Sequence, residues 1–380
     1  MIIIKGGEIH DGINRQPKVA DILVKDGKIS KIAKNITAKG ATIVDAKGLN
    51  VYPGFIDAHS HLGLDGYGIG YEGMDYNELN DILSPQLRGI DGFKPNQPHL
   101  RHAALAGVTT VNTGPGSADV LGGTFVAVKT VGIRADDMVV RMETSMKCAF
   151  GENPKRVYRD KGDSTRMSTA AKLRETLFKA REYADKKKAA AEDPSKAPGF
   201  DMKLEALLPV IRKEMPLKAH AHATEDIFTA LRIAKEFDVD ITLEHVTEGH
   251  LIADELAREG VPLAIGPALS SASKFELRNR TFETPAILDR AGCQVSIITD
   301  APVIPQEYLT LCAALAVKSG MDPFKALQAI TINPAKHSGI EDRVGSLEVG
   351  KDADIVLMDG DCFAVASNVV KVFILGEEVK

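Results

Sequence analysis

The chain has 380 residues, of which 44% are hydrophobic and 26% are charged, and its net charge is −5. This composition is typical of a globular protein, and the mild negative charge argues against a nucleic-acid or anionic-membrane surface. No stretch reaches the roughly 18 apolar residues of a membrane span, and the first apolar run is too short for a signal peptide. The four cysteines lack CxxC spacing, so we expect no disulfide framework, no thiolate zinc site and a reducing, cytoplasmic location.

Both ends of the chain contain short β-rich runs broken by Gly and Asp. Residues 1–52 hold three such runs, with a hairpin turn predicted at Asp26 and Gly27. Residues 343–380 contain similar runs. Isolated strands of this kind are only marginally stable. We therefore predict that the two ends pair into one small, discontinuous β-sandwich domain.

Residues 53–342 alternate between strand-like and helix-like stretches. After FIDAH, the predicted strands are VTTVNTG, VVRMETS, LKAHAHA, ITLEHV, PLAIGP and QVSIITDA, and the predicted helices are 97–106, 168–191, 225–236, 250–259, 284–292 and one after Pro305. Alternating βα units of about 25–30 residues indicate a parallel sheet. A (β/α)8 barrel of about 250 residues fits this length. The other architecture, an open doubly wound sheet, calls for a G-x-G-x-x-G turn, which the Gly-rich stretch 66–70 does not match.

The clearest chemical signal is the segment GFIDAHSHLG, residues 54–63. His59 and His61 close an apolar strand at a spacing of two, which points both imidazoles the same way. In a barrel, the carboxyl ends of the strands are where active sites lie. Two such imidazoles favour a divalent ion of the zinc class.

Three later strands also end in side chains that bind metals. LKAHAHA carries His220 and His222, TLEHVTEGH carries His245, and Asp300 ends the apolar strand SIITDAP. In a closed barrel these strand ends ring one mouth, so we expect the side chains to converge there. Asp300 could both bind metal and act as the general base for a metal-bound hydroxide. No G-x-S-x-G elbow is present to supply a serine nucleophile.

These motifs give the chain a resemblance to the amidohydrolase superfamily, in the group with imidazolonepropionase-like and dipeptidase-like enzymes. The resemblance covers nearly the whole chain and includes the closing segment NPAKHSGIEDRVGSLEVGKDADIVLMDG. It implies a distorted (β/α)8 barrel with one or two divalent ions. It also implies that His59, His61 and Asp300 hold a buried ion. By the same resemblance, His220 and His245 hold a second, more exposed one.

Two-metal members of the superfamily bridge their ions with a carboxylate, often a carboxylated lysine. In METSMKCAFGENPK the candidate is Lys147, since a buried lysine that faces metal ions loses its proton easily. The rival is Glu152, a carboxylate five residues further on. A one-metal site would use neither residue.

Several polar residues are weaker candidates for substrate contacts. His222 shares a face with His220, and Lys274 and Arg278 lie on the loop after the predicted strand PLAIGP. Each could equally be structural or solvated. We expect His250 to begin a helix and His337 to pack or cap locally. Ala301 stands where many relatives carry a histidine, which removes one substrate contact.

The sequence leaves the reaction open among three hypotheses. A dipeptidase or N-acyl amino acid hydrolase would need a cation for the substrate carboxylate, and Arg278 is the candidate. A cyclic amidohydrolase or deaminase, similar to imidazolonepropionase, is the second hypothesis. The third is a scaffold without activity, which the complete His and Asp set argues against. We expect a small-molecule substrate read by loops 64–100 and 266–285, and homo-oligomerisation stays open.

Overall fold

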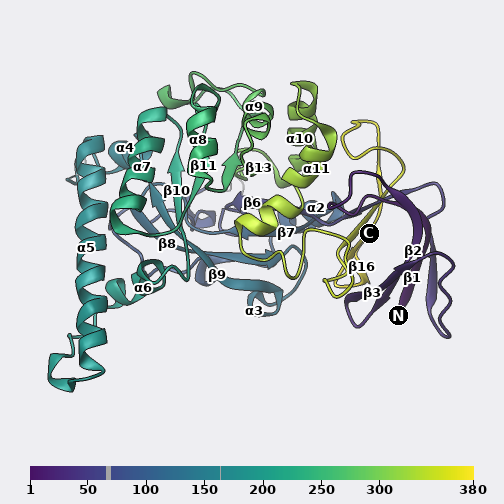
Figure 1. Ribbon diagram of the computed structural model, residues 1–380, viewed down its shortest axis with the longest axis horizontal. Coiled ribbons are helices and arrows are strands. Elements are labelled where there is room, and N and C mark those ends of the chain that lie inside the picture. Colours follow the sequence, from purple (N-terminus) through teal and green to yellow (C-terminus); the bar gives the residue numbers. More distant parts are fainter. Residues whose placement is uncertain (66–69, 163) are drawn as a thin grey trace.

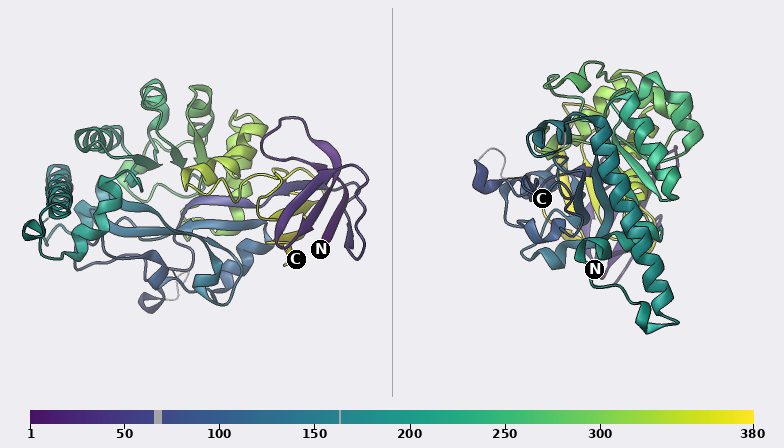
Figure 2. Two further views of the ribbon diagram at one scale, coloured as in Figure 1. Left: turned by 60° about the horizontal axis from the view of Figure 1, so that its bottom comes forward. Right: turned by 90° about the vertical axis from the view of Figure 1, so that its left-hand side faces the viewer.

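The computed structural model of the protein describes residues 1–65, 70–162 and 164–380. Residues 66–69, which belong to the Gly-rich stretch and to loop 64–100, lie outside the described residues. The chain forms two eight-stranded sheets, a large one in the middle and a small one at the end where both termini lie (Figures 1 and 2).

The large sheet is a nearly closed, distorted (β/α)8 barrel, as the sequence predicts. Its strands are β6 (Phe55–Ser60), β7 (Val108–Thr113), β8 (Leu121–Lys129), β9 (Val139–Ala149), β10 (Leu217–Ala221), β11 (Ile241–His245), β12 (Leu263–Ile265) and β13 (Val295–Ile297), joined in that order. The backbone N–H and the hydroxyl of Thr299 donate to Asp57 Oδ2 at 3.0 and 2.6 Å. This contact ties the segment after β13 to β6 and brings the two ends of the sheet together.

Strand β8 is a departure from the predicted all-parallel sheet. It pairs antiparallel with both β7 and β9, whereas the other neighbours in the sheet pair in parallel. Loop 114–120 explains this direction, since it is too short for the crossover that a parallel neighbour requires. Strand β9 is also longer than expected and runs to Ala149, so Lys147 lies within the strand rather than after it.

Helices line the outside of the barrel where the sequence predicts them (Figure 1). The predicted stretches correspond to α2 (Pro98–Leu105), α5 (Arg166–Ala190), α7 (Thr224–Phe237), α8 (Ala253–Glu259), α9 (Thr284–Arg290) and α10 (Leu309–Lys318). Short helices that the sequence analysis missed include α4 (Glu152–Val157), α6 (Met202–Ile211), α11 (Pro323–Ala329) and α12 (Ile332–His337). In the described part of the chain, no helix combines the length and apolar character that crossing a bilayer requires.

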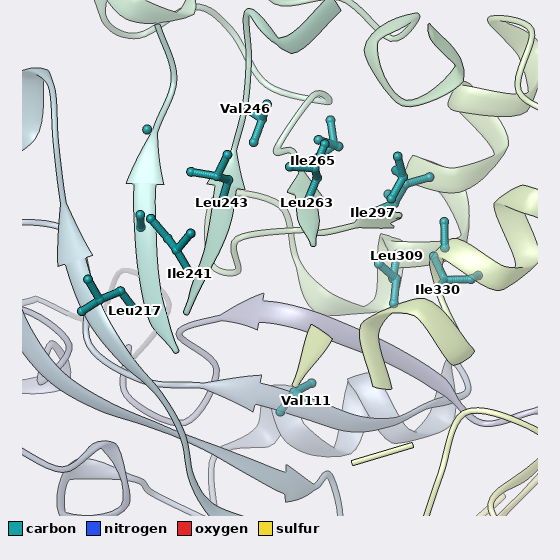
Figure 3. Close-up of a cluster of buried hydrophobic side chains, with 14 of the residues drawn as sticks. Val111, Leu217, Ile241, Leu243, Val246, Leu263, Ile265, Ile297, Leu309 and Ile330 are labelled. Atoms are coloured by element: carbon teal, nitrogen blue, oxygen red, sulfur yellow. The ribbon is translucent and has the colours of Figure 1, made fainter. Parts of the chain in front are cut away.

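The barrel strands alternate between apolar and polar side chains. On β10, Leu217 and Ala219 belong to the main hydrophobic core, whereas the intervening Lys218 and His220 are buried polar residues. Successive side chains of a strand point to opposite faces, so the polar set faces the barrel interior while the apolar set packs under the helices. Figure 3 shows this apolar layer along β10 to β13, including Leu217, Leu243, Leu263 and Ile297.

The small sheet joins the two ends of the chain, as predicted for the fold. Its strands are β1 (Ile2–Ile9), β2 (Lys18–Lys25), β3 (Lys28–Ala33), β4 (Thr42–Asp45), β5 (Asn50–Pro53), β14 (Ile355–Met358), β15 (Val369–Ile374) and β16 (Glu377–Glu378). The link is the antiparallel pairing of β5 with β14. Asp26 and Gly27 both have positive φ, at 51° and 74°, and form the predicted hairpin turn between β2 and β3.

Candidate active site

The predicted metal-binding side chains come from four barrel strands and the segment after a fifth. His59 lies on β6 with His61 next to its end, and Lys147 lies near the end of β9. His220 is the residue before the last of β10, and His245 ends β11. Asp300 follows β13 by three residues. The strands that carry these residues run parallel, so all of the side chains lie at the same end of the barrel.

One part of this cluster is centred on Asp300. Its Oδ1 lies 3.2 Å from His61 Nε2 and 3.6 Å from His59 Nε2. Lys147 Nζ lies 3.2 Å from the same His59 nitrogen. All four residues are buried or nearly so, and the side chain of Asp300 keeps 15% of its surface exposed. The carboxylate is therefore open to a small molecule while the imidazoles are shielded from bulk water.

The other part of the cluster contains three histidines. His220, His222 and His245 each offer a ligand atom within 4.8 Å of the other two. The ring centroids of His220 and His245 are 4.3 Å apart, and His245 lies 5.0 Å from the ring of His59. Because His245 touches both parts, the cluster is continuous from Asp300 to His222.

The outer ring nitrogens show how three of these histidines are oriented. The Nδ1 atom of His59 is bonded to Glu244 Oε2 at 2.9 Å, and those of His61 and His245 to the carbonyls of Gly114 and Gly266 at 2.8 Å. Carboxylates and carbonyls accept here, so each Nδ1 carries the proton. The Nε2 lone pairs are left to face the cluster, which is the arrangement of metal-binding histidines.

His220 presents its ring the other way round. Its Nδ1 is buried and has no hydrogen-bond partner among the described residues, while its Nε2 lies 3.8 Å from Glu276 Oε1. The same carboxylate oxygen lies 3.7 Å from His222 Nε2. A buried nitrogen without a partner costs free energy unless a ligand uses it. His220 is thus suited to bind an ion through Nδ1.

Burial sets the protonation of the cluster. It lowers the pKa of His59 and His220 well below the ordinary value and that of His245 to about 4, so these rings are neutral at pH 7. Burial also lowers the pKa of Lys147 to about 8. For Asp300 burial works to raise the pKa, but His245 and His61 hold it below its ordinary value. Neutral imidazoles and an ionised carboxylate are the forms that bind divalent cations.

Two of these residues also have a strained backbone. His245 and Asp300 have φ of 74° and 53°, in the left-handed region that non-glycine residues seldom occupy. Such residues cost on the order of 1–3 kcal/mol each and persist only where the surroundings enforce them. Both strained residues have side chains that belong to the cluster.

A match to a family of known proteins agrees with this geometry. The sequence fits the amidohydrolase family over residues 50–379, which is most of the chain. The chain belongs to the amidohydrolase family. It is thus a hydrolytic enzyme that acts on C–N bonds, and the scaffold hypothesis is set aside.

Individual relatives of this amidohydrolase carry different names. The solved structure of an amidohydrolase from Thermotoga maritima MSB8 is 40% identical, covers 100% of both chains and has a TM-score of 0.97. Amidohydrolase tasK of Hapsidospora irregularis is 29% identical over 94% of this chain, which spans only 39% of that protein. Imidazolonepropionase of Fusobacterium nucleatum is 26% identical, over 88% of this chain and 82% of that protein.

A buried polar network around Glu244, which the sequence analysis missed, supports the site of this amidohydrolase. Glu244 Oε2 accepts a hydrogen bond from Lys218 Nζ at 2.8 Å, and Glu244 Oε1 from His337 Nε2 at 2.8 Å. The prediction that His337 packs locally is therefore wrong, because its partner lies 93 positions away. A signal was present for Lys218, which shares the inward face of β10 with His220 at a spacing of two.

A cleft of about 500 Å³ opens above the cluster. His61, His220 and Asp300 line its base, and the predicted substrate contacts His222 and Lys274 line its wall. Tyr76, Asn77 and Ser270 on the wall belong to the predicted substrate loops 64–100 and 266–285. Wall residues outside those loops, which the sequence analysis missed, include Ser117, Asn153, Arg156 and Val303. They lie on loops and on the short helix α4, where no motif marks them.

Two predicted site residues lie away from this cleft. Arg278 Nη2 is 3.1 Å from Glu248 Oε1, and the guanidinium lies over the ring of Phe275. Arg278 is not among the described residues that line the cleft. The carboxylate of Glu152 accepts from the backbone N–H of Glu276 at 3.4 Å. Glu152 thus helps to hold the loop that bears Glu276.

A buried carboxyl group with a raised pKa lies beside one wall of the cleft. The Tyr158 hydroxyl, just after α4, lies 3.0 Å from the carbonyl oxygen of Glu78 and 2.7 Å from Asp119 Oδ1. The hydroxyl has one proton, and it donates that proton to Asp119 in the shorter of the two contacts. Burial nevertheless raises the pKa of Asp119 to about 7.

The burial of Asp119 predicts a pH-dependent stability. The pKa of Asp119 is about 7 in the fold and about 4 in the unfolded chain, so its contribution is present below pH 4 and is lost as the pH rises through 7. Asp119→Asn is neutral at every pH and keeps an oxygen that can accept from Tyr158. Between pH 4.5 and 7.5, urea unfolding should show wild type losing on the order of 2 kcal/mol relative to this variant. A difference in unfolding free energy between the two proteins that does not change with pH would contradict the raised pKa of Asp119.

Proposed function

We propose that this amidohydrolase uses one or two divalent ions, most simply zinc, to hydrolyse the amide bond of N-acyl amino acids or dipeptides. The observation that carries the proposal is the convergence of unshared imidazole nitrogens and one carboxylate at the base of a 500 Å³ cleft. His59, His61 and Asp300 would hold one ion. His220 and His245 would hold the second.

The separations in the cluster suit such ions. Zinc lies 2.0–2.1 Å from nitrogen and oxygen ligands, so two ligands of a tetrahedral site are about 3.4 Å apart. Asp300 Oδ1 lies 3.2 and 3.6 Å from the two Nε2 atoms of His61 and His59. The unpartnered Nδ1 of His220 supplies the ligand on the other side.

Lys147 is the proposed bridge between the two ions. Its Nζ is buried within 3.2 Å of His59 Nε2, and a pKa of about 8 leaves part of the amine neutral at pH 7.5. A neutral amine can attack CO2, forming an N–C bond and losing a proton to give a carbamate. Glu152 is less suited, since its carboxylate already accepts from the Glu276 backbone.

Asp300 is the proposed general base. A divalent ion, when bound, supplies a hydroxide near neutral pH and polarises the scissile carbonyl. Asp300 would take the proton from the attacking water and deliver it to the leaving nitrogen, which departs as a neutral amine. His222, on the cleft wall beside His220, would contact the polarised oxygen of the substrate.

A second candidate is the opening of a cyclic amide. Support comes from the similarity to imidazolonepropionase of Fusobacterium nucleatum over most of both chains. The same general base and ions would serve this reaction, so only the substrate distinguishes the two. Cyclic amides therefore belong in the same assay panel.

The test is a substrate screen on protein stripped of metal and then reloaded with Zn²⁺ or Mn²⁺. We expect turnover of N-acyl amino acids or dipeptides that disappears with the metal and returns with it. Faster turnover of cyclic amides would favour the second candidate. Reloaded protein that cleaves no amide in the panel would contradict the proposed function.

A further inference from the structure

The basic residues around the cleft are not equivalent. Lys274 Nζ lies 2.6 Å from Glu276 Oε1 and donates to Asn153 Oδ1 at 3.0 Å, so its charge is balanced. Arg278 is paired with Glu248 away from the cleft. Arg156 is exposed, lines the cleft, and forms no ion pair with the residues that the structure describes. Among the described residues that line the cleft, Arg156 is thus the cation whose charge is not balanced by an ion pair.

Helix α4 sets the position of Arg156 relative to the reaction. Asn153 Nδ2 lies 3.5 Å from His220 Nε2, which puts the start of α4 against the metal-binding cluster. Arg156 is three residues further on, so it shares a face with Asn153 and lies about 4.5 Å further along the helix axis. A guanidinium there can reach a group a few bonds away from a scissile amide at the cluster.

Contacts at the end of α4 fix the position of Arg156. Tyr158, two residues after Arg156, is tied by its hydroxyl to Asp119 and to the Glu78 carbonyl. The helix that carries Arg156 is therefore held between the loop at Glu78 and the cluster. A guanidinium on a fixed support can bind a carboxylate with two parallel hydrogen bonds, which adds geometric selectivity to charge.

We infer that Arg156 selects substrates with a free carboxylate next to the scissile amide. This inference rests on the proposed amide hydrolysis and deepens it, because it replaces Arg278 with Arg156 as the residue that binds the substrate's anionic group. The substrate class is then an N-acyl amino acid or a dipeptide with an uncapped C-terminus. The matching carboxamides lack the charge and are poor substrates.

The test compares Arg156→Met with Arg159→Met, in which an exposed arginine just beyond the helix is changed. Each zinc-loaded protein is assayed with a panel of N-acetyl amino acids and with their carboxamides. We expect Arg156→Met to raise KM for the acids about 10- to 100-fold with a small change in kcat, and to leave the carboxamides unaffected. Arg159→Met should behave as wild type. Equal rates on acids and carboxamides in wild type, or equal losses in both variants, would overturn the inference.

Calorimetry separates this inference from the proposed function. The titrant is the same panel of N-acetyl amino acids, added to each zinc-loaded protein. If no amide is cleaved but wild type binds the acids and Arg156→Met does not, the proposed reaction fails while the carboxylate site stands. If wild type and Arg156→Met bind them equally, the carboxylate site fails whatever the reaction is.

Discussion

Asp300→Asn is expected to lower kcat by about 1,000-fold while leaving the fold intact. Asparagine keeps the shape of the side chain but cannot accept and return a proton, a role that contributes roughly 100- to 10,000-fold to a rate. It is also a weaker ligand, so metal affinity should fall as well. The measurement is kcat at saturating Zn²⁺ on the best substrate of the panel, with circular dichroism to establish folding.

Asp254→Asn is the matched control for this change. Asp254 is exposed on α8, outside the cleft, and its variant should keep wild-type kcat. The role of Asp300 would be disproved if its asparagine variant, fully loaded with metal, kept more than a tenth of the activity. In that case another group in the cluster would have to be the base.

Glu244→Gln is expected to cost the protein about 3–5 kcal/mol of stability. The carboxylate has no exposed surface and holds Lys218, His59 and His337 through hydrogen bonds of 2.8–2.9 Å. Removing the charge leaves the ammonium of Lys218 buried without its counter-ion, which is among the most destabilising changes in a protein interior. Thermal unfolding of the metal-free variant should show a melting temperature lower by roughly 5 °C.

The control for this prediction is Glu175→Gln on α5. Glu175 pairs with Lys179 at 2.6 Å, but both side chains are exposed, and such pairs contribute at most about 1 kcal/mol. A double variant, Glu244→Gln with Lys218→Met, should recover part of the lost stability because the unpaired charge is gone. Equal losses for Glu244→Gln and Glu175→Gln would show that the buried network is not stabilising.

The convergence of the candidate metal ligands could be predicted from the sequence because each side chain marks the end of a strand. His59, His220 and Asp300 follow short runs that favour buried strands, and parallel strands bring such ends to one face of a barrel. The hairpin at Asp26 and Gly27 could also be predicted, since its turn requires positive φ at two residues.

The parts that could not be predicted depend on contacts between distant segments. Strand β8 could not be recognised as a strand without knowledge of its antiparallel neighbours. The bond between His337 and Glu244 and the choice of Arg156 over Arg278 depend on how loops fold against the barrel. No local sequence pattern predicts those contacts.

The most direct test of the central claim is the anomalous scattering of crystals grown with zinc, measured on both sides of the zinc absorption edge. The account predicts a peak about 2.1 Å from His59 Nε2, His61 Nε2 and the Asp300 carboxylate, and a second peak, if the site is binuclear, near His220 Nδ1 and His245 Nε2. A map at saturating zinc with no peak at this cluster, or with peaks only at other residues, would contradict it.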